Sequence, residues 1–496
     1  MYSEIELNTP TAPESLRTKI VRGSIWNMAG TMMAQAVKIV SMIVIARLLT
    51  PADFAIAGLS TAATQLIILF GGFGFGEALI AKKEITKESC HTVFWATAAI
   101  KIVIGLIICL LAGTLADFYQ NQLLVKPIIF IGIGFIFSIG NVVPANLLYR
   151  EMRFWELNVV NFIATVISVI IAVILATKGF GYWSIIFPAV VITPLRTIMQ
   201  SIVAKYSPRL RFSWQELRQM ANFGFFVLGT KVARFFAENG DYLILGRFLP
   251  TALFGQYYFA YEKARLTIDS IAPQLEGTLF PAFSKMQDNV ARLRDKCLEA
   301  TQMITWFTYP LSIILILLAK PLVPIVFGAQ WRAAIVVFQF FCAYAFTYYL
   351  WGSAQMTLYS LNKPQSIFYF EIIKMFLLLP LLFCAGISGI TIEQIALFML
   401  ITTSILNVGM TVYIYRLLGT TWIHFGRHFY SLCAACGVLA VVGLVVIHRL
   451  DGLRFIYTIY NLIGLCLAGL LIYVITLMIV QKGFWQKINL VFRSIK

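Results

Sequence analysis

Charged residues are scarce in this chain of 496 residues. Asp, Glu, Lys and Arg make up 12% of it and hydrophobic residues 60%, whereas a soluble globular protein has about 25% charged residues. This shortage excludes an ordinary soluble domain. Long polar connections are also missing, because the longest has only about fifteen residues between apolar runs. We therefore expect no soluble catalytic domain between the apolar segments.

Patterns of catalytic or metal-binding residues are missing as well. The four histidines have no metal-ligand spacing, and no Ser/His/Asp pattern is present. The eight cysteines are scattered. Cys433 and Cys436 have redox spacing but lie in an apolar run, where small residues at a helix contact are the better explanation. We expect a protein that is not an enzyme and that holds no metal and no cofactor.

Apolar runs are what the sequence has in abundance. We count fourteen runs, each close to the length needed to cross a bilayer as a helix. The first is too long for a signal-peptide core, so we expect it to be retained. The pattern predicts an all-α polytopic membrane protein with spans near residues 22–47, 53–79, 92–115, 125–148, 155–176, 182–204, 219–248, 253–282, 300–318, 333–359, 365–385, 392–416, 428–448 and 455–480.

Basic residues are distributed unevenly between the two sides of this topology. With an even number of spans both termini lie on one side. That side holds 23 Lys and Arg, the opposite side eight, and the spans the remaining eight. The positive-inside rule places both termini in the cytoplasm. The net charge of +17 then reflects topology and contact with anionic lipid, and we expect no nucleic-acid partner.

Two of the spans carry stripes of charge. At about 100° per residue the charges of each stripe share one helix face. Seven of them facing lipid would cost on the order of 20 kcal/mol, so the stripes must face each other, other helices or water. An ion-pair lattice that only joins helices is the alternative to a functional interior. The stripes are Lys231, Arg234, Glu238 and Asp241 in the seventh run, and Glu262, Arg265 and Asp269 in the eighth.

An internal repeat links the first and seventh runs. Arg, Leu, Ala and Phe recur at an offset of 200 residues between 46–54 and 246–254, which places Lys38 level with Glu238. Six spans per repeat keep both halves in one orientation, with a binding site expected between them. The predicted units are a disordered cytoplasmic tail 1–18, an N-lobe 19–204, a basic cytoplasmic linker 205–219, a C-lobe 220–418, and 419–496 with two appended spans and an amphipathic tail.

Several short features allow two interpretations. The glycine-rich stretch 71–76 permits close packing or a hinge. The linker, with Arg209, Arg211 and Trp214, suits an interfacial segment or a solvated basic loop. Glu371 and Lys374 are spaced as an ion pair, which we favour over a functional role. The two appended spans line a lipid-side groove or simply pack.

Several motifs resemble those of one transporter family. They include Gly76-Glu77-Ala78-Leu79-Ile80, Leu147 to Phe154, Asn239-Gly240-Asp241, Gly255-Gln256-Tyr257-Tyr258, and Phe327-Gly328-Ala329-Gln330-Trp331. In order and spacing, from about Arg17 to Leu418, they resemble the polysaccharide transport family of lipid-linked oligosaccharide flippases, within the multidrug/oligosaccharidyl-lipid/polysaccharide (MATE-like) superfamily.

The resemblance implies two six-helix lobes in a V, with the first, second, seventh and eighth spans around a central cavity. It implies a flippase that moves undecaprenyl-diphosphate-linked oligosaccharide repeats to the outer leaflet of the bacterial cytoplasmic (inner) membrane by alternating access. Such a flippase serves exopolysaccharide, O-antigen or capsule synthesis, with polysaccharide polymerase and export machinery as partners beside membrane lipids. The alternative is a cation-coupled small-molecule (multidrug) exporter of the same superfamily, which would favour a cavity of net negative charge.

The resemblance also implies roles for the interior charges. Substrate binding falls to Lys38, Lys231, Arg234 and Arg265, because cations suit a diphosphate and acidic sugars. The carboxylates Glu238, Asp241, Glu262 and Asp269 would then hold these cations, bind sugar hydroxyls, or couple transport to H⁺ or Na⁺.

Overall fold

The computed structural model describes residues 16–82, 85–151, 153–269, 290–361, 363–451 and 458–481. Throughout these ranges the chain is helical and contains no strand. Parts of four predicted features lie outside the described residues: the N-terminal tail, the end of the eighth span around Pro273 and Pro281, the connection that follows it, and the amphipathic C-terminal segment.

The helices follow the predicted runs closely. In the first half they are α1 Leu16–Leu48, α2 Pro51–Leu69, α3 Phe75–Ala81, α4 Lys87–Phe118, α5 Val125–Phe137, α6 Val142–Arg150, α7 Phe154–Thr177 and α8 Trp183–Val203. In the second half they are α9 Trp214–Phe248, α10 Thr251–Asp269, α12 Val290–Leu322, α13 Ile335–Ser360, α14 Pro364–Ile387, α15 Ile392–Leu417, α16 Trp422–Asp451 and α17 Ile459–Val480. Three short pieces complete the list: η1 Gln122–Leu124, the π-helical turn η2 Val323–Phe327 and η3 Ala329–Ala334.

The chain is a multi-pass membrane protein. Within the described residues ten helices are long and apolar enough to cross a membrane, or eleven if the bent pair of α5 and α6 forms one crossing. Every predicted run corresponds to one helix or to one pair of helices. The count of fourteen crossings stays a prediction.

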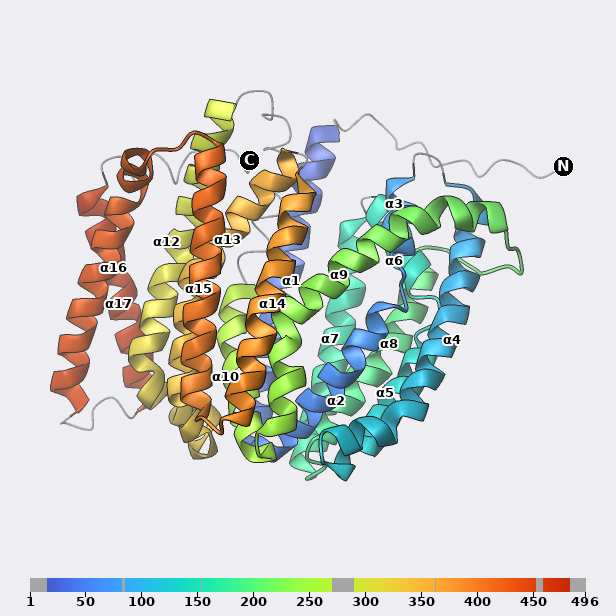
Figure 1. Cartoon of the computed structure of the whole chain (residues 1–496), viewed down its shortest axis with the longest axis horizontal. Helices are drawn as coiled ribbons and strands as arrows, with labels where there is room; N and C mark the ends of the chain where they lie inside the picture. Colours follow the sequence, from blue (N-terminus) through green and yellow to red (C-terminus); the bar gives the residue numbers. More distant parts are fainter. Residues whose placement is uncertain are drawn as a thin grey trace.

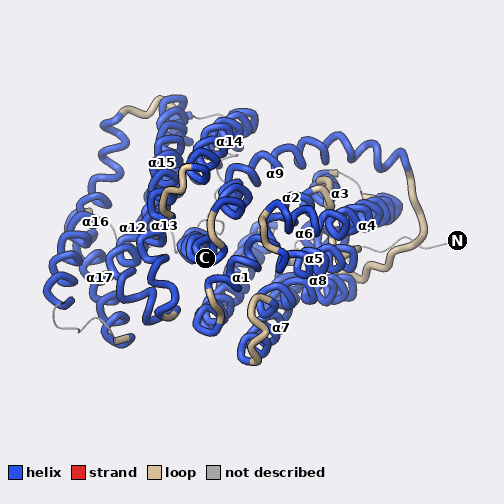
Figure 2. Tube along the Cα trace, turned by 60° about the horizontal axis from the view of Figure 1, so that its bottom comes forward, coloured by secondary structure: helices blue, strands red, loops and turns tan. Residues whose placement is uncertain are grey.

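The helices form two groups side by side (Figure 1). We call α1–α8 the N-lobe and α10–α15 the C-lobe. Helix α9 belongs to both, since it contacts α3 and α4 near its start and packs along α14 further on. The same connection is visible in Figure 2, where α9 arches from one group to the other. We call the end of the molecule where α1 begins the upper face, as in Figure 1, and the opposite end the lower face.

Two predicted spans are broken rather than continuous. The second breaks between α2 and α3, where Phe73 and Gly74 have positive φ angles of 43° and 69°. A Cβ at Gly71 would overlap the ring of Phe135, so this glycine allows close packing beside the break. The fourth bends by 56° between α5 and α6, near Gly140 with φ of 88°. A positive φ angle ends a helix at that residue. The length of an apolar run, from which the spans were predicted, carries no information about such angles.

The appended helices α16 and α17 pack against α12 at the edge of the C-lobe. An apolar groove of about 470 Å³ runs between these three helices. Its walls include Ile314, Leu317, Leu439, Gly443, Leu465 and Gly469. The pair therefore both packs on the bundle and lines a groove.

Candidate functional site

The two lobes meet at the lower face through the repeated segments. The turn between α1 and α2 and the turn between α9 and α10 occupy matching positions, 200 residues apart. Three glycines bring them together, because an added Cβ at Gly58, Gly246 or Gly255 would meet Tyr258, Leu59 or the Pro51 carbonyl of the opposite segment. This equivalent placement is what an internal repeat predicts.

A buried tryptophan reinforces the lower junction. Trp331 of η3 is fully buried and stacks on Phe259 of α10 with ring centroids 3.8 Å apart. It also meets Phe54 of α2 edge-to-face at 4.9 Å. Its indole N–H donates to the carbonyl of Ala46 over 2.9 Å, and the Arg47 Nε donates to the carbonyl of Val326 over 2.8 Å. The lower ends of both lobes are thus tied together.

The two predicted stripes face each other at Glu238. Its Oε2 lies 3.1 Å from Nη2 of Arg265 on α10, and its Oε1 lies 3.9 Å from Nε of Arg234 one turn earlier on α9. The three side chains are only partly buried, with Arg234 the most exposed at 43%. Of the three surroundings expected for the stripes, namely each other, other helices or water, the structure shows the α9 stripe facing the α10 stripe at this point.

The other carboxylates are held by tyrosines. Asp241 is 2% exposed, and its Oδ2 accepts a hydrogen bond from the Tyr257 hydroxyl over 2.9 Å. Its Oδ1 has no hydrogen-bond partner within the described parts of the chain. Glu262 accepts from the Tyr242 hydroxyl over 3.1 Å. These tyrosines come from the same two helices, so the stripes form a mixed network of charge and phenol.

Three predicted site residues are less well placed. Lys38 lies on α1 with an exposed side chain, and Lys231 is half-buried on α9, more than one turn before Glu238. Asp269 is the last residue of α10, and its side chain lies outside the described residues. A joint site that includes these three stays a prediction.

A pocket of about 570 Å³ opens beside the Glu238–Arg265 pair. Its residues come from α9, α10, α13, α14 and α15, so the pocket lies between α9 and the C-lobe. Besides Glu238 and Arg265 it is lined by Tyr261, Tyr344, Tyr348 and Lys374. The expected central cavity had walls from both lobes, whereas none of this pocket's lining residues comes from α1 or α2. The difference arises because Glu238 and Arg265 turn toward α13–α15.

Two lysines contribute in ways that the sequence did not indicate. Lys374 is 5% exposed and reaches the pocket, although its spacing with Glu371 favoured an ion pair over a functional role. Glu371 is equally buried, and its Oε2 has no hydrogen-bond partner in the described ranges. Lys263 Nζ lies 5.4 Å from the ring centroid of Phe54 and 5.6 Å from that of Phe259, so it joins the lobes by cation–π contacts. The contact with Phe54 crosses from α10 to α2 and therefore leaves no periodic signal in the sequence.

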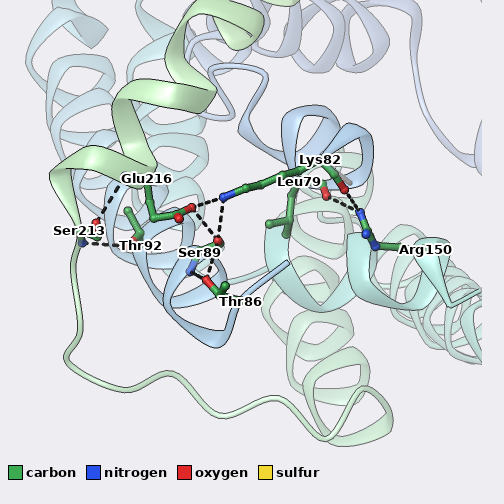
Figure 3. Close-up of polar contacts among 8 residues, drawn as sticks. All are labelled: Leu79, Lys82, Thr86, Ser89, Thr92, Arg150, Ser213 and Glu216. Atoms are coloured by element: carbon green, nitrogen blue, oxygen red, sulfur yellow. Dashed lines mark hydrogen bonds and ion pairs between the residues drawn. The ribbon is translucent and has the colours of Figure 1, made fainter. Parts of the chain in front are cut away.

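A polar cluster at the upper face ties the start of α9 to the N-lobe (Figure 3). Glu216 forms an ion pair with Lys82 and accepts a hydrogen bond from the Ser89 hydroxyl over 2.6 Å. These hydrogen bonds hold the pKa of Glu216 below its usual range. Nearby, Arg150 Nη1 donates to the carbonyl of Leu79 over 3.3 Å and also to that of Lys82. The upper end of α9 is therefore fixed to the N-lobe, while the rest of the helix packs along α14 of the C-lobe.

Residues 44–336 match the family described as polysaccharide biosynthesis protein. The match covers more than half of the chain. The chain belongs to the polysaccharide biosynthesis protein family. The matched residues include α9, α10 and the lower junction, so the fold elements that carry the charged stripes are those of the family.

Several relatives of this chain have names that refer to polysaccharide biosynthesis. The chain is 28% identical over 326 residues to the succinoglycan biosynthesis transport protein ExoT of Rhizobium meliloti, covering 66% of this chain and 65% of that protein. It is 25% identical over 391 residues to the lipopolysaccharide biosynthesis protein WzxC of Escherichia coli, covering 76% and 78%. It is 23% identical over 328 residues to the teichuronic acid biosynthesis protein TuaB of Bacillus subtilis, covering 65% and 67%.

Solved structures with similar folds cover most of the chain. The lipid II flippase MurJ in an inward closed conformation matches with a TM-score of 0.74 and 14% identity, over 95% of this chain and all of MurJ. An inward-facing multidrug resistance MATE transporter of the MOP superfamily matches with a TM-score of 0.60 and 14% identity, over 80% of this chain and 98% of the transporter. The predicted MATE-like fold class is confirmed.

Proposed function

We propose that this family member is a flippase for lipid-linked oligosaccharides. It moves undecaprenyl-diphosphate-linked repeat units from the inner to the outer leaflet of the bacterial cytoplasmic membrane by alternating access. The observation that carries the proposal is the Arg234–Glu238–Arg265 cluster, built from two helices inside a bundle of this family. The names of ExoT, WzxC and TuaB, which all refer to polysaccharide synthesis, support the substrate class.

The cations would bind the anionic part of the substrate. Arginine presents a planar fork of donors that matches phosphate and carboxylate oxygens. Arg265 and Arg234 would hold the diphosphate or an acidic sugar, together with Lys231 and Lys38 as these come close when the lobes move. Glu238 keeps both arginines in place while no substrate is bound. The tyrosines of the pocket offer flat faces and hydroxyls, which suit sugar rings.

The carboxylates would couple binding to motion. Substrate phosphate competes with Glu238 for Arg265, and the released carboxylate can then take up H⁺ or Na⁺. Asp241, with one oxygen unpaired in the described structure, is the second candidate, and Glu262 and Asp269 complete the proposed set. A ligand moves a conformational equilibrium only through such differential interactions with the two states.

The upper face would lie in the cytoplasm. Its loops hold most of the basic residues, as the positive-inside rule requires. The junction at the lower face would then close the outer side, and the next step of transport would require Trp331 and the three glycine contacts to separate. Partnership with a polysaccharide polymerase belongs to the same proposal.

The small-molecule exporter is the less supported alternative. Resemblance to MATE transporters at 14% identity concerns the fold alone, whereas the named relatives belong to polysaccharide synthesis. The test is transport by the purified full chain in vesicles. A fluorescent undecaprenyl-diphosphate oligosaccharide should become accessible to a reagent on the opposite side faster than in protein-free vesicles. Cationic drugs taken up while the lipid stays in place would favour the exporter instead.

A further inference from the structure

The connection between α8 and α9 turns large apolar side chains outward. Leu210 is 88% exposed, Trp214 69% and Phe212 51%. Three such residues within five positions form an apolar patch of a kind that soluble loops rarely leave uncovered. We call residues 205–214, from the end of α8 to the first residue of α9, the linker strap.

The backbone of the linker strap is fixed although its side chains are exposed. The carbonyl of Arg209 accepts a hydrogen bond from Trp95 Nε1 over 2.8 Å, and the Arg209 N–H donates to His91 Nδ1 over 3.3 Å. The Ser213 N–H donates to Thr92 Oγ1 over 3.0 Å. Both ends of the exposed patch are therefore held against α4. The apolar side chains point outward because the fold presents them there.

The anchoring residues set the depth of the patch. Helix α4 has 32 residues, so it is about 48 Å long and exceeds a hydrocarbon core of about 30 Å by about 9 Å at each end. Thr92 and Trp95 lie in its second and third turns, which places them where the hydrocarbon core gives way to headgroups. Figure 1 shows the connection running alongside the upper end of α4 rather than beyond it. Leu210, Phe212 and Trp214 thus lie at headgroup depth.

The charge of the strap favours an anionic surface. Lys205, Arg209 and Arg211 of the strap are exposed, as is Arg218 in the first turns of α9, and Arg209 and Arg211 alternate with the apolar side chains. The only acidic residue between 205 and 218 is Glu216, which is engaged by Lys82 and Ser89. Cations interleaved with a leucine and two aromatic residues match phosphate headgroups above an apolar boundary.

We propose that the linker strap is a docking surface for the anionic phospholipids of the cytoplasmic leaflet. Leu210, Phe212 and Trp214 insert at the boundary of the acyl chains, and Arg209 and Arg211 bind headgroup phosphates. Because the strap is bonded to α4 and leads directly into Glu216, this contact anchors the N-lobe and the first turn of α9 in the membrane plane. The interpretation as a solvated basic loop does not account for the three exposed apolar side chains.

Photo-cross-linking in the full chain tests the proposal. Benzoylphenylalanine replaces Phe212, and the protein is placed in vesicles of phosphatidylcholine mixed with an equal amount of phosphatidylglycerol. We expect lipid adducts enriched in phosphatidylglycerol. Arg209→Gln with Arg211→Gln should lower that enrichment by about five-fold for each arginine, since a basic residue near an anionic leaflet contributes about 1 kcal/mol.

Two controls make the result decisive. Lys363→Gln with Arg416→Gln removes the same charge from exposed residues at the upper face outside the strap, and should leave the enrichment unchanged. Benzoylphenylalanine at Leu110, which is 81% exposed in the lower half of α4, should give lipid adducts in every variant and so verifies insertion. The proposal is overturned if position 212 forms no lipid adducts while position 110 does, if the enrichment ignores the arginines, or if position 212 in native membranes cross-links to a protein instead.

Discussion

Arg265 and Arg234 share one carboxylate, and this shared partner decides how substitutions should act. Removing either arginine leaves Glu238 with the other, so the protein should still fold. Removing a charge-assisted hydrogen bond to a bound phosphate costs about 1.5–3 kcal/mol, or roughly ten- to a hundred-fold in binding. Substituting either arginine should therefore weaken substrate binding without disrupting helix packing, which distinguishes the two possible roles of the cluster.

Arg234→Ala and Arg265→Ala should each abolish surface polysaccharide in cells that depend on this chain. The inserted protein should remain at normal level, as measured in membrane fractions by immunoblot. Arg→Lys at either position should restore export partly, because a point cation lacks the bidentate fork. Lys178→Ala, at an exposed residue between α7 and α8, is the matched control. Loss of folded protein in both alanine variants would mean that the cluster only joins helices.

Asp241→Asn should slow turnover more than it weakens substrate binding. The Tyr257 hydroxyl can still donate to the amide oxygen, so the local packing survives. The amide cannot take up a proton or bind Na⁺ as a carboxylate does, and the step that couples charge to motion is lost. Transport rate and substrate affinity are measured on the same reconstituted protein. Wild-type rates in both Asp241→Asn and Glu238→Gln would assign the coupling to other residues.

The helices followed from the sequence more directly than their interruptions, of which only the break within the glycine-rich stretch 71–76 was among the expected alternatives. The run 155–176 became α7 at Phe154–Thr177, because long apolar runs leave few alternatives to a helix. The break at Phe73 and Gly74 and the bend near Gly140 depend on single φ angles. For the site, the residue spacing identified Glu238 and Arg265. The contacts of Lys263, Tyr257 and Lys374 became recognisable only from the packing of α10 and α14 against their neighbouring helices.

The upper tie of α9 should depend on pH through Glu216. Its pKa is lowered in the folded protein, so its contribution to stability is fully present above the unfolded value of about 4.3. That contribution is lost as the pH falls through the lower folded pKa. We expect the protection factor of the amides in the first turn of α9, which is the intrinsic exchange rate at each pH divided by the observed rate, to fall below about pH 4 in the wild type. In Glu216→Gln this protection factor should be low at every pH, since the charge that attracts Lys82 is absent.

The matched control for this tie is Glu88→Gln, at an exposed carboxylate in the first turn of α4. It alters the same region without touching the Lys82–Glu216 pair, so α9 should exchange as in the wild type. An unchanged first turn of α9 in Glu216→Gln, with the rest of the protein folded, would show that the helix is held by packing rather than by the ion pair.

For the whole molecule, the two faces differ in charge and in closure. In the predicted topology most basic residues fall in the loops of the upper face, and the lower face joins the lobes through Trp331 and glycine contacts. Asp53 and Asp117 lie at the lower ends of α2 and α4, and Asp451 at that of α16. The orientation of the chain in the membrane therefore decides on which side the lobes are closed, because the closed junction and these aspartates lie on the same side of the molecule.

Reporter fusions should place both termini in the cytoplasm and fusions after Asp53, Asp117 or Asp451 outside it. The expectation comes from the excess of basic residues in the upper loops. Alkaline phosphatase is active only outside the cytoplasm and a fluorescent protein only inside, so paired fusions give opposite signals. Fusions that place Lys83 or Arg292 outside would reverse the orientation and assign the closed junction to the cytoplasmic side.

Gly255→Ala should force the lower junction open. A Cβ at Gly255 would overlap the backbone carbonyl of Pro51 on the opposite lobe, and a carbonyl cannot rotate away as a side chain can. Overpacking of this kind costs about 1–3 kcal/mol, which lowers the ratio of closed to open molecules by roughly five- to 150-fold. In the state with the lower junction separated, the added methyl group meets no clash and costs no free energy. The equilibrium therefore shifts toward that state.

Labelling of Leu59→Cys measures the shift. Leu59 is 2% exposed and contacts Gly246 across the junction. A membrane-impermeant maleimide should therefore react slowly with the Leu59→Cys protein and several-fold faster when Gly255→Ala is added. Labelling of the wild-type chain, which lacks this cysteine, gives the background to subtract. Gly229→Ala on α9 is the matched control, because a Cβ there meets nothing within 4 Å. Equal labelling in both glycine variants, with normal thermal stability, would show that the lower junction tolerates the extra methyl group and that its closure does not depend on the Gly255–Pro51 approach.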